Sequence, residues 1–68
     1  MDPTKCQTFT NRNGVRVSVI SGRHPDVPER YVHYIEVAGV PERMSQGGLV
    51  TYPDRPAATF AAKSRRPK

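Results

Sequence analysis

Four cations near the C-terminal end are the residues best suited to bind a charged partner. Lys63, Arg65, Arg66 and Lys68 fall within six residues that contain no acid. Clustered cations bind phosphate backbones by releasing counterions, and a flexible segment can follow a groove. Residues 1–62 keep seven basic against six acidic groups, so most of the net charge of +5 belongs to this short segment.

Arginine and tyrosine side chains in the rest of the chain suggest a second surface for the same kind of ligand. Arginine binds phosphate through a planar fork, and tyrosine rings can stack on unpaired bases. Interleaved acidic residues oppose such a surface, because they dilute its field. The predicted polyanion-binding set is Lys63, Arg65, Arg66, Lys68, Arg12 and Arg16, with Tyr31 and Tyr34 as stacking residues.

Metal binding and catalysis find little support in the sequence. The soft ligands are limited to Cys6, His24 and His33, without a tight pair such as Cys-x-x-Cys. Zinc sites usually take four ligands from cysteine and histidine at such spacings. A glycine-rich phosphate loop, a nucleophile elbow and a close carboxylate pair are all missing. We therefore expect a non-catalytic protein with no metal and no cofactor.

The length of 68 residues bounds the protein to one small domain. A domain of about this size buries only about 60% of the surface that its unfolded chain exposes, so its stability margin is small. Association of subunits is a common way to stabilise such a domain, and a homodimer is one form that this association can take. Cys6 is the single cysteine, so no disulfide can form within the chain.

An apolar signal peptide and a membrane-length apolar run are both missing. We expect a cytoplasmic location without membrane attachment.

The apolar residues favour strands over a helical bundle. Eight valines, two isoleucines and five threonines stand against one leucine, and β-branched side chains pack well on a pleated sheet. The clearest element is a hairpin with strands over residues 6–10 and 15–20 around an Asn-Gly signal. A two-residue Asn13-Gly14 turn competes with a three-residue loop over residues 12–14. We favour the longer loop, with Gly14 left-handed, because it gathers apolar residues on one face.

The rest of the chain divides into shorter pieces. Residues 21–30 form an irregular connection, residues 31–38 a strand ended by Gly39, residues 40–46 one helical turn and residues 49–52 a short strand. Residues 55–62 are ambiguous between an edge strand and a helix capped by Asp54; helix propensity favours the helix. The expected core residues share one phase of the strand alternation, and they are Phe9, Val17, Val19, Ile35, Val37 and Val50.

These elements predict a small β-rich α+β domain over residues 1–62. It is an antiparallel sheet of three or four strands with a short helix, followed by a disordered basic tail over residues 63–68. A small sheet leaves two edge strands, whose unpaired backbone groups can accept a strand from a partner.

The predicted function is docking on a larger protein partner, as a regulator or adaptor of the kind found among compact bacterial and phage proteins. The alternative is a nucleic-acid-binding protein that uses the basic tail and an Arg/Tyr face of the sheet. A protein partner is favoured because the folded part is nearly neutral, whereas dedicated nucleic-acid binders concentrate cations on their surface.

Overall fold

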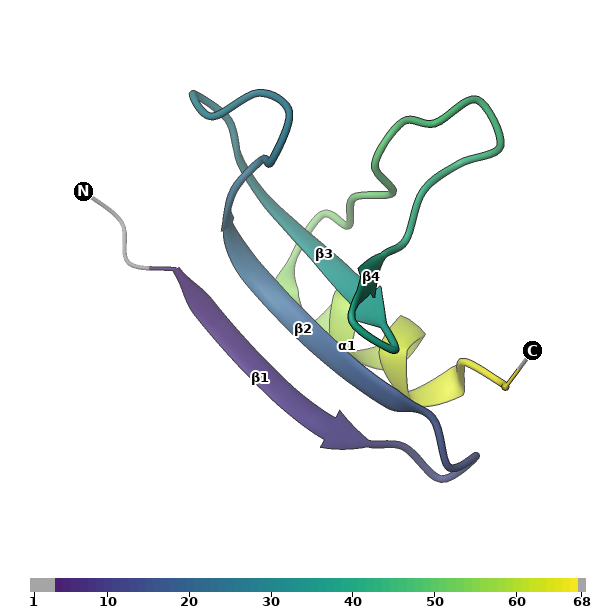
Figure 1. Ribbon diagram of the computed structural model, residues 1–68. Helices are drawn as coiled ribbons and strands as arrows, with labels where there is room; N and C mark the ends of the chain where they lie inside the picture. The colour runs from purple at the N-terminus through teal and green to yellow at the C-terminus, as the bar shows by residue number, and fades with distance from the viewer. Residues whose placement is uncertain (1–3, 68) are drawn as a thin grey trace.

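The computed structural model describes residues 4–67, which form a four-stranded antiparallel sheet with a helix on one face (Figure 1). The elements are β1 Lys5–Thr10, β2 Arg16–Arg23, β3 Tyr31–Val37, β4 Val40–Pro41 and α1 Arg55–Ser64. The order in the sheet is β1-β2-β3-β4, the same as the order along the chain. The expected β-rich α+β class is confirmed.

The β1–β2 hairpin has the register that the apolar pattern favours. Phe9 lies opposite Val17, and Gly14 has a φ of 78°, in the left-handed region that glycine tolerates. The buried Asn11 side chain organises the loop, because its Oδ1 atom accepts hydrogen bonds from the backbone N–H groups of Asn13 and Val15 at 2.9 and 3.0 Å. The three-residue loop is therefore confirmed.

The connection between β3 and β4 overturns one expectation. Ala38 and Gly39 both have positive φ, 53° and 82°, and Val37 pairs with Val40 across them. Two left-handed residues form the tight hairpin turn that matches strand twist, so the chain returns at once along β3. The helical turn expected over residues 40–46 is wrong. Pro41 is accepted in β4 because it lies at a position whose N–H would point away from β3.

The fourth strand is interrupted by an excursion over residues 43–49. Glu42 N–H donates to the Ile35 carbonyl at 3.1 Å, and Tyr52 N–H donates to the His33 carbonyl at 2.8 Å, so pairing with β3 resumes after the excursion. The short strand expected over residues 49–52 is present only as isolated bridges at Leu49 and Tyr52. Arg43 in the excursion forms an ion pair with Asp26 of the β2–β3 connection at 2.9 Å.

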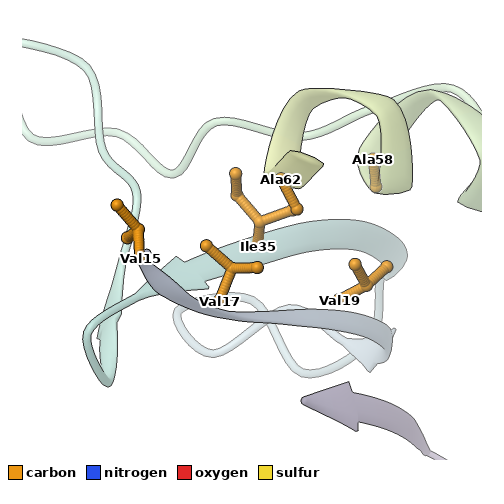
Figure 2. Packing of buried hydrophobic residues seen from close by; sticks show 6 residues of the cluster. All are labelled: Val15, Val17, Val19, Ile35, Ala58 and Ala62. Atoms are coloured by element: carbon orange, nitrogen blue, oxygen red, sulfur yellow. The ribbon is translucent and has the colours of Figure 1, made fainter. Parts of the chain in front are cut away.

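The main core lies between α1 and the two central strands (Figure 2). Its buried members are Val15, Val17, Val19, Ile35, Ala58 and Ala62. Three of the six expected core residues, Val17, Val19 and Ile35, are thus confirmed as buried, whereas Phe9, Val37 and Val50 are only half-buried. The prediction missed Val15, Ala58 and Ala62 in this core. It also missed Ile20 and Val32, which are buried on the opposite face of the sheet, and Leu49.

The last segment is a helix, as favoured over an edge strand. Asp54 caps it as expected, since its carboxylate accepts from the Ala57 N–H at 2.9 Å. The helix continues through Lys63 and Ser64, and Arg65 is held by further contacts. The ordered chain therefore extends past the boundary expected at residue 62.

Ala38 offers a test of the β3–β4 turn. A non-glycine residue in the left-handed region costs about 1–2 kcal/mol, and asparagine tolerates it better than alanine. Ala38→Asn creates the favoured Asn-Gly turn, so we expect it to raise the free energy of unfolding by about 0.5–1 kcal/mol in urea titrations. Ala38→Val should lower it, and a lower stability for Ala38→Asn would contradict this turn geometry.

Candidate functional site

Strand β1 is an open edge of the sheet. It pairs with β2 on one side only, and α1 packs against β2 and β3. In Figure 1, α1 lies behind β2 and β3, and β1 stands clear of it. Every β1 residue except the half-buried Phe9 is exposed. Within residues 4–67, β1 is therefore a regular strand with one unpaired backbone edge.

The register shows which backbone groups are available on this edge. Asn11 N–H donates to the Val15 carbonyl at 2.9 Å, which makes that pair hydrogen-bonded. Because hydrogen-bonded and non-hydrogen-bonded pairs alternate in antiparallel sheets, the backbone groups of Gln7 and Phe9 point toward β2. The N–H and C=O groups of Cys6, Thr8 and Thr10 consequently face away from the sheet.

An open hollow of about 360 Å³ lies between the end of β1 and α1. We call it the β1–α1 hollow, and its lining is Phe9, Thr10, Asn11, Arg12, Phe60, Lys63 and Ser64. Phe60 is 76% exposed, more than any other large apolar residue among those described. The lining thus combines two aromatic rings with two cations and contains no acidic residue.

The structure separates most of the predicted polyanion-binding set. Arg12 and Lys63 meet at the β1–α1 hollow. Arg16 is exposed on β2 opposite Thr10, in the phase of the strand alternation that faces away from α1. Arg66 is exposed beyond α1, and Lys68 lies outside the described residues. The five cations of this set that the structure describes therefore do not form one continuous surface.

The two predicted stacking residues do not share a face of the sheet. Tyr31 lies opposite Arg23 and Tyr34 opposite Ile20, and these positions have opposite phase in the strand alternation. Tyr31 is 45% exposed and stands edge-on to His33. Tyr34 is half-buried, and burial raises the pKa of its hydroxyl. A common stacking platform is not formed by this pair.

Arg65 forms a polar clasp that sequence reasoning did not predict. Its guanidinium donates to both carboxylate oxygens of Glu42 at 2.5 and 2.6 Å and to the Tyr52 hydroxyl at 3.0 Å. Its carbonyl accepts from the side-chain amides of Asn11 and Asn13 at 2.8 and 3.0 Å. The clasp fastens the end of α1 to both hairpins, and it engages a cation of the predicted polyanion-binding set.

The clasp also changes the titration of its acid and its phenol. Hydrogen bonding to the Arg65 guanidinium is the main cause that lowers the pKa of the Glu42 carboxyl. Burial, followed by the hydrogen bond to Glu42, raises the pKa of the Tyr52 hydroxyl. Both pKa shifts favour the same state, in which the Glu42 carboxylate is ionised and the Tyr52 phenol is protonated.

A serine–histidine contact lies beneath the start of α1. Ser21 is 2% exposed, and its hydroxyl lies 2.8 Å from Nδ1 of His33 while accepting from the Arg55 guanidinium at 2.7 Å. Arg55 also donates to the Val19 carbonyl at 3.3 Å. The buried Ser21 hydroxyl thus has a hydrogen-bond partner in His33 of the sheet and another in Arg55 of the helix, and these contacts fasten α1 to the sheet.

The remaining histidine holds a turn together. Nδ1 of His24 accepts from the backbone N–H groups of Asp26 and Val27 at 3.0 and 3.3 Å, within the β2–β3 connection. No group of three or more histidine, cysteine or carboxylate side chains gathers as a metal site in the part of the chain that the structure describes.

The clasp predicts a specific pH dependence of stability. The pKa of Glu42 is lower in the folded protein than in the unfolded chain, where it is about 4.5. The ionised carboxylate therefore contributes its full stabilisation of the fold above about pH 4.5, and this stabilisation is lost as the pH falls through the folded-state pKa. We expect Glu42→Gln to destabilise the protein by about 1 kcal/mol near neutral pH, the upper end for partly exposed ion pairs. The difference from the wild type should shrink in acid.

Urea unfolding from about pH 3 to pH 7 measures this difference. The exposed Glu29 in the β2–β3 connection supplies a matched control, and Glu29→Gln should change stability little at any pH in the series. A deficit in Glu42→Gln that stays constant into acid would contradict the ion pair as its source.

Among residues 4–67, no helix has the length and apolar character that crossing a membrane requires. The protein-family models, the curated proteins and the solved structures contain no match to this chain.

Proposed function

We propose that this protein is a non-catalytic docking protein that binds a partner protein by strand addition at β1. The observation that carries this proposal is the open backbone edge of β1. It is six residues long, contains no proline and lies outside the cover of α1. We place the protein in the cytoplasm, where the exposed Cys6 thiol stays reduced.

The contrast between the two edges of the sheet supports β1 as the docking strand. Proteins usually protect edge strands with short length, proline, bulges or a covering loop. The opposite edge has these devices, because β4 is two residues long, contains Pro41 and is followed by the excursion over residues 43–49. Strand β1 has only Lys5 as a protective charge.

Strand addition at β1 would use backbone and side chains together. The groups of Cys6, Thr8 and Thr10 that face away from the sheet would pair with the backbone of the incoming strand. Alternate side chains of that strand would then lie on the threonine face and on the α1 side of the sheet. Affinity therefore comes from the main chain, and selectivity from what the side chains meet.

The competing proposal of nucleic-acid binding has weaker support. Arg65 is engaged by Glu42, and the two tyrosines belong to opposite faces. The charge that remains available on the C-terminal segment is smaller than its composition suggests. Deleting residues 63–68 would also remove the clasp, so that deletion cannot measure the charge of the segment by itself.

Thr8 gives a sharp test of strand addition. Thr8→Pro removes an N–H that faces away from the sheet, a position where edge strands tolerate proline. Thr8→Ala removes the same hydroxyl contact with Ser18, which is 2.9 Å in the wild type, but keeps the N–H. For peptides selected against the wild type from a random displayed library, we expect Thr8→Pro to weaken binding about tenfold or more, roughly one lost backbone hydrogen bond.

Amide hydrogen exchange provides a second measurement that needs no substitution. In the free protein, the amides of Gln7 and Phe9 should be protected, and those of Cys6, Thr8 and Thr10 should exchange freely. Bound peptide should slow the second group. Equal binding by folded Thr8→Pro and Thr8→Ala, or no slowing at these three amides, would refute docking at β1.

A further inference from the structure

We propose that the β1–α1 hollow makes this docking edge selective for an acidic segment of another protein. A strand added to β1 would place an apolar side chain against Phe9 and Phe60, with carboxylates beside Arg12 and Lys63. The inference rests on the proposed function and names the chemistry of the partner.

Within residues 4–67, the apolar part of the hollow is left uncovered. Helix α1 turns its small residues, Ala58 and Ala62, toward the sheet, so the large ring of Phe60 is left 76% exposed. Phe9 packs against the edge of the core and lines the same hollow. Two neighbouring rings at an open strand edge form the pocket that strand addition uses for selectivity.

The register places the incoming side chain at this pocket. Residues directly opposite each other in a sheet point to the same face. Phe9 lies opposite Val17, a core residue beneath α1, so the Phe9 face is the α1 side. The residue of an added strand that lies opposite Phe9 therefore points to the α1 side as well, where the hollow is open.

Charge decides which segment fits. Neither β1 nor α1 contains an acidic residue, and Arg12 and Lys63 line the hollow. Two acids elsewhere, Asp26 and Glu42, are engaged by Arg43 and Arg65. An acidic strand meets complementary charge here, whereas a basic strand meets repulsion.

The same charges disfavour a second copy of this chain as the occupant. If two β1 strands paired antiparallel about Thr8, Lys5 of one copy would lie opposite Asn11 of the other, beside its Arg12. The pairing therefore brings cations toward cations and supplies no carboxylate, because β1 contains no acidic residue. The acidic partner removes this conflict and covers the exposed Phe60.

The test uses a labelled peptide in which threonine alternates with glutamate, phenylalanine and glutamate, so that the acids and the aromatic residue share one face. A matched peptide carries lysine in place of glutamate, and a short oligothymidine reports nucleic-acid binding. We expect the wild type to bind the glutamate peptide at least about tenfold more tightly than the lysine peptide, by fluorescence anisotropy.

Variants in the hollow localise the effect. Lys63→Glu and Phe60→Ala should each weaken binding of the glutamate peptide about tenfold. Arg30→Glu makes the same charge change in the β2–β3 connection, and Met44→Ala trims an exposed apolar side chain in the excursion. Both controls should stay within about twofold of the wild type. Phe60, Arg30 and Met44 are exposed, so their three variants should keep the wild-type melting temperature. Lys63→Glu also puts a negative charge in the last turn of α1, which weakens the helix, so binding is measured at a temperature where every variant is folded.

The outcomes separate this inference from the function on which it rests. Equal binding of the two peptides, equal effects of Lys63→Glu and Arg30→Glu, no binding of the glutamate peptide, or preferred binding of oligothymidine would each overturn the acidic partner. A dimer that Thr8→Pro dissociates would assign β1 to a second copy instead. If the glutamate peptide responds to Lys63→Glu and not to Thr8→Pro, strand addition fails while the charge preference stands.

Discussion

The packing of α1 on the two central strands determines what the rest of the surface can do. A helix is about 10 Å wide, and neighbouring strands lie about 4.8 Å apart, so one helix covers about two strands. Ala58 and Ala62 let α1 lie close to Val17, Val19 and Ile35 (Figure 2). A four-stranded sheet with one such helix on its two central strands leaves both outer strands, β1 and β4, outside the cover of the helix.

The two outer strands meet this constraint differently. On one side, β4 is short, contains Pro41 and continues into the excursion, which Arg43 ties to Asp26. On the other side, β1 is regular and exposed, and the rim of α1 adds Phe60 and Lys63 beside it. This asymmetry brings outward-facing backbone groups, apolar surface and positive charge together at β1 and the rim of α1. The coincidence of these three features supports the proposed docking site there.

The clasp shows why composition alone misleads about an interface. Arg65 belongs to the most basic segment of the chain, yet its guanidinium is held by Glu42 and its carbonyl by Asn11 and Asn13. A cation bound within the fold contributes to stability and is withdrawn from ligands. The charges that matter for binding are those left unengaged, and Arg12 and Lys63 gain their significance from their position beside two aromatic rings.

Local patterns in the sequence determined the β1–β2 register, the third strand and the Asp54 cap, because alternation, turn residues and capping act over a few residues. Alternation also separates Tyr31 from Tyr34, a signal available in the sequence that our grouping of them ignored. The tight turn at Ala38-Gly39 does not follow from the sequence, because alanine is an unusual residue in the left-handed region. For that reason the segment after it was predicted to be a helical turn and not a returning strand. Only the tertiary structure joined Glu42 to Arg65 and Phe9 to Phe60, since contacts between residues so far apart depend on how the helix crosses the sheet, which no local pattern encodes.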